Sequence, residues 1–214
     1  MHEGSLMTLS DEIRKCTKCI DLGIASSDRL NSHQKPYVQF AVEGKWKPPD
    51  EVDVLFIAES PPWNGKQRYF YNPNVGDERP SLREKVLKYL KLNSLEEFKL
   101  DKRFFLIDTI KCRLNKSKNI KPRLSINGIA KTCAEQFLCR EIEELKPQTI
   151  FVLGDIAKKA LQRFSEFDEL KEHKVSKGFD GNLSGYHVIL CVFPNRRTEA
   201  KYKNQIRGAF AKLL

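Results

Sequence analysis

The chain has 214 residues, and its 38 lysines and arginines outnumber its 28 aspartates and glutamates, so the formal net charge is +10. This excess is typical of proteins that bind polyanions, although a basic solvated surface has the same composition. The apolar runs VLFIA and TIFVLG are too short to span a bilayer and the first residues lack a signal-peptide pattern, so we expect a cytoplasmic protein without a membrane partner, nucleoid-associated if prokaryotic.

Four continuous apolar runs, rich in β-branched and aromatic residues, alternate with helical patterns. Such runs are typical of strands covered on both faces, and helices between them favour a parallel sheet. In chain order, the sequence predicts a strand over 52–57, a helix over 81–92, a strand over 103–108, a helix over 127–146, a strand over 148–153, a helix over 154–164, a strand over 187–193 and a helix over 199–214. We therefore expect an α/β fold, a three-layer αβα sandwich with a central four-stranded, mostly parallel sheet, as a single monomeric domain over residues 1–214.

Distinctive residues stand where the predicted strands end. Glu59 follows the first strand, Asp108 ends the second, Gly154 and Asp155 follow the third, and residues 193–197 follow the fourth. Open parallel sheets bind their ligands outside the carboxyl ends of the strands. The sequence thus predicts one functional edge of the sheet.

Four of the six cysteines form a candidate metal site. Cys16 and Cys19 have the C-x-x-C spacing that lets two sulfurs reach one metal, and Cys112 and Cys133 complete four thiolates from a second region. Such a set fits either tetrahedral zinc or an iron–sulfur cluster. We expect the remaining cysteines, Cys139 and Cys191, to belong to the core.

The order of these motifs resembles the iron–sulfur uracil-DNA glycosylases, families 4 and 5 of that superfamily. The resemblance covers most of the chain and rests on C-x-x-C, AESPP after the first strand, IDTIKCR at the end of the second, TC on the next helix and REIEELKPQTIFVLGDIA. It implies a uracil-DNA glycosylase-like domain that flips a damaged base out of DNA and hydrolyses its N-glycosidic bond. It also implies that the four cysteines hold a [4Fe–4S] cluster rather than zinc.

The resemblance assigns roles to residues after the first strand. Glu59 falls on the acidic residue of the family 4 motif G-E-x-P-G, which implies that it positions or activates the water that attacks the sugar. Pro61 falls on the proline of the same motif. Phe70 falls near the aromatic residue on which the flipped base stacks, although its neighbours Tyr69 and Tyr71 allow a register shift of one residue.

Three departures separate this chain from members that read uracil. Ala58 and Pro62 replace the glycines of the first motif. Asp108 replaces an asparagine whose amide reads the uracil edge, and an ionised aspartate only accepts hydrogen bonds, so it favours a base edge that presents donors. Phe193 replaces the histidine that stabilises charge on the leaving base, and it cannot donate a hydrogen bond.

The segment after Phe193 is expected to contact substrate and DNA. Asn195 is a candidate substrate-binding residue, and Arg196 and Arg197 stand where the family inserts a loop into DNA, so their guanidiniums suit phosphate contacts. The alternative for the two arginines is a solvated turn.

Three classes of function fit these observations. The first is a base-excision repair glycosylase that acts on a deaminated or alkylated base, with Glu59 and Asp108 as its catalytic carboxylates. The second is a non-catalytic iron–sulfur protein that binds nucleic acid on the same scaffold, which the three departures favour. The third is a small-molecule enzyme such as a nucleoside hydrolase, against which the net charge argues.

Overall fold

The structure, a computed structural model, describes residues 9–18, 41–42, 45–46, 51–61, 70–71, 82–112 and 126–214. A five-stranded sheet with strand order β4-β3-β5-β7-β6 forms its centre. The four predicted strands are confirmed as β3 (Val54–Ala58), β4 (Phe104–Asp108), β5 (Thr149–Leu153) and β7 (Tyr186–Cys191), which run parallel.

The fifth strand, β6 (Phe179–Leu183), adds to the four that the sequence predicts. It lies at the sheet edge, antiparallel to β7, and its side chains alternate between partly covered and exposed. An edge strand of this kind lacks the continuous apolar run by which the other strands are recognised. Ser184 and Gly185, both with positive φ, close the hairpin between β6 and β7. In a separate two-stranded sheet, β1 (Ala41–Val42) pairs antiparallel with β2 (Lys45–Trp46).

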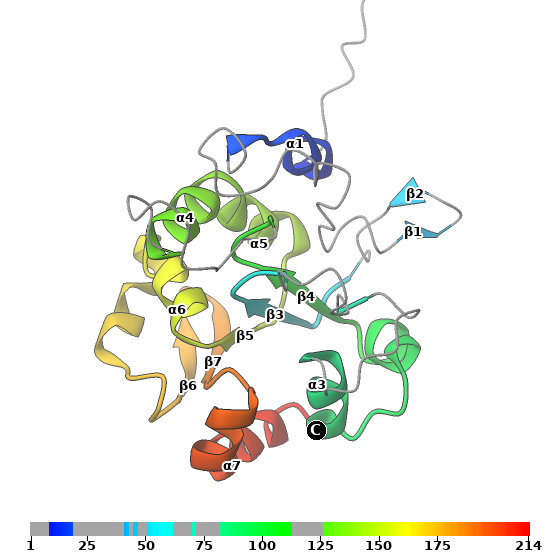
Figure 1. The fold of residues 1–214 in the computed structure, drawn as a ribbon, viewed down its shortest axis with the longest axis vertical. Coiled ribbons are helices and arrows are strands. Elements are labelled where there is room, and N and C mark those ends of the chain that lie inside the picture. Colours follow the sequence, from blue (N-terminus) through cyan, green and yellow to red (C-terminus); the bar gives the residue numbers. More distant parts are fainter. Residues whose placement is uncertain are drawn as a thin grey trace, which may run out of the picture.

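Helices cover both faces of the sheet, as the three-layer prediction requires (Figure 1). On one side lie α4 (Ile126–Cys133), α5 (Cys139–Leu145) and α6 (Asp155–Leu161), with α1 (Leu9–Lys15) next to them; on the other lie α3 (Leu82–Leu90) and α7 (Arg196–Ala211). The predicted helix 127–146 is α4 and α5 joined by a π-helical turn, η4 (Ala134–Leu138). Two shorter helical segments are η3 (Glu97–Asp101) and η5 (Ser165–Glu172).

An aromatic core fixes α7 on its face of the sheet. The ring of Phe56 on β3 lies 5.0 Å from that of Phe151 on β5 and 6.2 Å from that of Phe210 on α7. The Phe210 ring also stacks on Tyr89 of α3, with ring centres 5.2 Å apart. Because aromatic pairs at these separations attract each other beyond their burial, they hold the C-terminal part of α7 against the sheet.

None of the helices within the described residues is long and apolar enough to cross a membrane.

Candidate active site

The two candidate carboxylates, Glu59 and Asp108, lie at the ends of neighbouring parallel strands. Ala58, the last residue of β3, is paired with Asp108, the last residue of β4. Backbone pairing continues beyond the strands, since the Thr109 N–H donates to the Ala58 carbonyl (2.8 Å) and the Ile110 N–H to the Glu59 carbonyl (2.9 Å). Asp108 is buried and Glu59 is half-buried. The structure therefore brings both carboxylates to one edge of the sheet.

Each carboxylate is followed by a hydroxyl residue that the sequence analysis overlooked. The side-chain oxygens of Ser60 and Thr109 are buried, and neither has a hydrogen-bond partner in the part of the chain that the structure describes. Buried hydroxyls are normally satisfied by protein or by water. Two of them beside two carboxylates mark a place suited to a polar occupant. Pro61, the next residue after Ser60, is buried, whereas Pro62 lies outside the described residues.

Tyr71 closes the outer edge of β4. Its hydroxyl accepts a hydrogen bond from the Leu106 N–H (2.5 Å) and donates one to the Leu106 carbonyl (3.0 Å). These are the backbone groups that an edge strand leaves without a neighbour. Burial raises the pKa of Tyr71 well above its ordinary value, the hydrogen bond with Leu106 opposes that rise, and the nearby charge of Asp108 adds to it.

Phe70 lies beside this anchored tyrosine. Its ring is half-buried, 5.0 Å from the Tyr71 ring and 5.2 Å from the Phe98 ring. Tyr71 itself is only 5% exposed, and its hydroxyl is engaged with β4. Of the two described aromatic candidates for base stacking, Phe70 is thus the accessible one; Tyr69 lies outside the described residues.

Phe193 follows β7 and packs closely on the end of β5. A Cβ added to Gly154 would lie 3.1 Å from the Phe193 Cβ, and Gly154 has a φ of +90° that other residues rarely adopt. The Gly154 N–H donates to the Cys191 carbonyl at 2.8 Å. Glycine at this position therefore allows the end of β5 and the end of β7 to approach each other. Phe193 is half-buried and lies on the side of the sheet where the parallel strands end, as do Glu59 and Asp108.

Asn195 has a structural role that the sequence analysis overlooked. Its side-chain oxygen accepts hydrogen bonds from the backbone N–H groups of Arg197 (2.9 Å) and Thr198 (3.0 Å), and the Thr198 hydroxyl accepts from the Asn195 N–H (2.9 Å). This reciprocal pair is a capping box at the start of α7. The N-x-x-T spacing could have indicated it. Arg196 and Arg197 form the first turn of α7 and are exposed.

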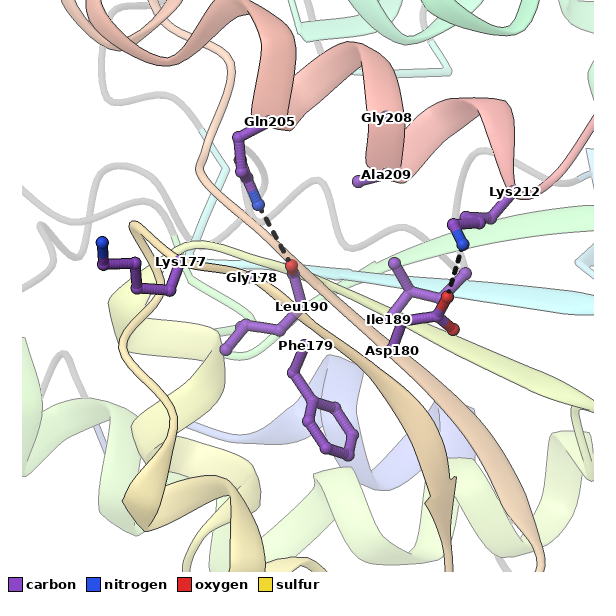
Figure 2. Close-up of a pocket in the computed structure, with 10 residues that line it drawn as sticks. All are labelled: Lys177, Gly178, Phe179, Asp180, Ile189, Leu190, Gln205, Gly208, Ala209 and Lys212. Carbon is purple, nitrogen blue, oxygen red and sulfur yellow. Dashed lines mark hydrogen bonds and ion pairs between the residues drawn. The ribbon is translucent and has the colours of Figure 1, made fainter.

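A hollow of about 320 Å³ lies elsewhere, between β6, β7 and α7 (Figure 2). Lys212 and Asp180, which line it, pair with each other at 2.9 Å. Gln205, also at its wall, donates to the Leu190 carbonyl (3.3 Å) and accepts from the Val192 N–H (3.3 Å). Gln205 thus satisfies backbone groups of the chain at the end of β7, next to the first residue of β6. None of the predicted site residues lines the hollow.

The candidate metal ligands are partly assembled. Cys133, at the end of α4, accepts a hydrogen bond from the Lys111 N–H at 3.4 Å, which brings it next to Cys112. Cys112 and Cys133 are buried, and Cys16, after α1, packs on the same core as Cys133. Cys19 lies outside the described residues. Within the described ranges, no group of three or more cysteine, histidine or acidic residues is close enough to hold a metal.

The two remaining cysteines differ from each other. Cys191 is fully buried, as predicted, and burial raises the pKa of its thiol to about 12. Cys139 is half-buried rather than part of the core, because it lies on the outer face of α5 with its thiol 3.4 Å from the Glu143 carboxylate. Burial, and then the Glu143 hydrogen bond, raise the pKa of Cys139 to about 11.

Comparison with known families agrees with this geometry. The family model of the uracil DNA glycosylase superfamily matches residues 45–213, well over half of the chain. A search of curated proteins gave no match. The matched range contains β3, β4, β5 and β7 together with Glu59, Asp108 and Phe193. The chain belongs to the uracil DNA glycosylase superfamily.

Proposed function

We propose that this protein is a base-excision repair glycosylase that hydrolyses the N-glycosidic bond of a deaminated or alkylated base in DNA. Membership in the superfamily supports DNA glycosylase activity in general, with DNA as the substrate. The observation that supports the finer proposal is the register of β3 and β4, in which Ala58 pairs with Asp108, so that Glu59 and Asp108 both lie at the carboxyl ends of neighbouring parallel strands.

In the proposed reaction, Glu59 acts on the water. Its carboxylate accepts a proton from water as the oxygen attacks C1′ of the sugar, while the bond between C1′ and the base nitrogen breaks and its electrons leave with the base. The negative charge of Glu59 also stabilises the positive charge that develops on the sugar. The hydroxyls of Ser60 and Thr109, which have no hydrogen-bond partner among the described residues, are suited to hold that water or a polar group of the base.

Asp108 is proposed to read the base edge. An ionised carboxylate has acceptors and no donor, so it favours a base that presents an amino group or a ring N–H at this position. Phe70 and Phe193 are proposed to contact the two sides of the flipped base, since aromatic rings stack on any base. Arg196 and Arg197 are proposed to contact phosphates beside it.

A [4Fe–4S] cluster held by Cys16, Cys19, Cys112 and Cys133 is proposed as the metal centre, with zinc as the alternative. The hydrogen bond from the Lys111 N–H to the Cys133 sulfur is compatible with this proposal, because hydrogen bonds to the sulfurs are one of the means by which proteins tune iron–sulfur clusters. When bound, the cluster would stabilise the fold. Iron and acid-labile sulfide measured per chain, in the native protein and in Cys112→Ala, distinguish cluster from zinc.

One observation favours a second function, a protein of the same scaffold that binds nucleic acid without turnover. Phe193, which has no polar side-chain atom, is packed at the site edge where a donor to the leaving base would be expected. Losing one such donor typically slows an enzyme by about 10²–10³-fold rather than stopping it.

An excision assay separates the two functions. Labelled oligonucleotides carrying uracil, hypoxanthine, xanthine or an alkylated base, both single-stranded and paired, are incubated with the native protein and then cleaved at abasic sites. Product from any of these bases establishes the glycosylase. Binding of the same strands without product would establish the non-catalytic function.

A further inference from the structure

Lys111 is a buried lysine that none of the roles described so far uses. It is 1% exposed, and its ammonium forms an ion pair with the carboxylate of Glu141 on α5 at 2.5 Å. Glu141 is itself 0% exposed. Charged side chains are almost never buried to this extent unless they are paired.

Lys111 makes two further contacts, one with the candidate active site at Asp108 and one with the candidate metal ligand Cys133. Its ammonium also donates to the backbone carbonyl of Asp108, three residues earlier, and its backbone N–H donates to the Cys133 sulfur at 3.4 Å. The first contact closes the turn that follows β4. The second brings that turn to the end of α4. One residue thus connects the strand end that carries Asp108 with Cys112 and Cys133.

The helix that carries the counter-charge also holds the segment with the third described cysteine. Arg140, the residue before Glu141, makes two hydrogen bonds to the Glu12 carboxylate on α1, at 2.6 and 2.7 Å. Cys16 follows directly after α1. Consecutive residues of α5 therefore hold the segments that carry Cys16 and Cys112.

Stability alone is a poor explanation for such a pair. Replacing a buried ion pair with apolar side chains of similar volume is often neutral or stabilising, because each charge loses its hydration. A backbone carbonyl that must be held at a fixed place, by contrast, requires a donor that an apolar side chain lacks.

We propose that Lys111 is a positioning residue that fixes the turn from Asp108 to Cys112, and that Glu141 is the counter-charge that keeps Lys111 there. The turn sets both the place of the Asp108 carboxylate at the sheet edge and the approach of Cys112 to Cys133. The part of this inference that concerns Asp108 rests on the proposed glycosylase function, whereas the part that concerns the cysteines does not.

The test uses the double variant Lys111→Met/Glu141→Leu, which removes both charges and keeps the site apolar. Lys158→Met, which removes a mostly buried lysine from α6, is the matched control. Single variants are unsuitable because each leaves one buried charge without its partner. We expect the double variant to fold with a urea midpoint close to the native one, since methionine and leucine fill the space of the ion pair and leave no buried charge.

The first readout is the accessibility of the thiols. Alkylation of Cys112 and Cys133 in the protein as isolated, followed by mass spectrometry, is expected to become faster by about tenfold or more in the double variant, because the turn opens locally. Cys191, which is fully buried between other elements, serves as the internal reference and should not change. Native alkylation rates in a folded double variant would overturn the proposal.

The second readout is excision. On the base that the native protein releases, we expect kcat of the double variant to fall by roughly 10²-fold, since a displaced site group has an effect of that size, while KM changes little. Unchanged kcat in a folded variant would overturn the Asp108 part of the proposal. If the native protein excises no base at all, it is the proposed function that fails, and the thiol readout still decides the cysteine part.

Hydrogen exchange of the native protein requires no variant. A peptide covering residues 104–112 should exchange as slowly as one covering β3, because the turn is pinned at both ends. Exchange of residues 109–112 as fast as that of an exposed loop would contradict the proposal, even if the double variant fails to fold.

Discussion

In the proposed function, Asp108 is the residue that selects the base. Its carboxylate stands at the end of β4, where an amide would offer one donor and one acceptor to a base. We predict that Asp108→Asn shifts excision toward uracil, because the amide restores a donor for the uracil carbonyl. A well-placed pair of hydrogen bonds discriminates between bases by about 1–3 kcal/mol.

The measurement is the ratio of kcat/KM for uracil and for the base that the native protein prefers. Asp108→Leu is the control, because it removes the carboxylate without adding a donor. An unchanged ratio in Asp108→Asn would mean that Asp108 does not contact the base edge.

Thr109 provides a second prediction for a single residue. Its hydroxyl is fully buried without a hydrogen-bond partner in the described residues, and a buried polar group in that state costs about 1–3 kcal/mol. We predict that Thr109→Val keeps or raises the free energy of unfolding and lowers the excision rate, because the hydroxyl is used by the water or the base. Urea unfolding and single-turnover excision check the two parts; equal activity with raised stability would show that the hydroxyl has no role in the reaction.

The junction of β5 with α6 depends on a glycine. Gly154 combines a φ of 90° and a ψ of 178° with a close approach to Phe193. A residue with a side chain in this region is strained by about 1–3 kcal/mol. We predict that Gly154→Ala lowers the free energy of unfolding by that amount and also slows excision, because Phe193 is displaced.

Gly208, on α7, is the matched control for the Gly154→Ala substitution. It lies on the exposed side of α7, and a Cβ added there meets nothing within 4 Å. Gly208→Ala should raise the free energy of unfolding by about 0.5–1 kcal/mol, because alanine loses less chain entropy in a helix. Urea unfolding of both variants tests the pair, and equal effects of the two substitutions would refute the role given to Gly154.

At the scale of the whole molecule, the net charge of +10 predicts salt-dependent binding to DNA. Arg196 and Arg197 start α7 at the same edge of the sheet as Glu59. Replacing both with alanine should weaken binding and reduce the slope of log K against log salt by about 0.9 for each lost contact on duplex DNA, or about 0.7 on single strands. Arg103→Ala, at the opposite end of β4, is the control and should leave the slope unchanged.

Much of the fold could be predicted because its signals are local. Continuous apolar runs mark strands covered on both faces, and the ends of those strands place Glu59 and Asp108 on one edge. β6 gave no such signal because it is an edge strand of alternating polarity. The Lys111–Glu141 pair joins residues 30 positions apart in the sequence and depends on tertiary packing, although Glu141 stands on the apolar face of α5, one turn from buried Phe137 and Leu145.

The site also shows what local patterns leave out. The motif makes Asn195 a candidate substrate-binding residue, and the structure adds that its side-chain oxygen caps α7. Tyr71 is one of three adjacent aromatic residues that the sequence cannot rank, and only the hydrogen bonds with Leu106 show that it anchors the edge of β4. Competing roles for the same residue type are resolved by packing, which the sequence does not display.

The most direct test of the proposed function is single-turnover excision by native protein and by Glu59→Gln on one labelled oligonucleotide, with the affinity for that strand measured in parallel. A carboxylate that activates water contributes about 10²–10⁴-fold to the rate. The proposed mechanism predicts a fall of that size with unchanged affinity, since glutamine keeps the shape of the side chain. Equal rates for the two proteins would contradict the role of Glu59 and the reaction built on it.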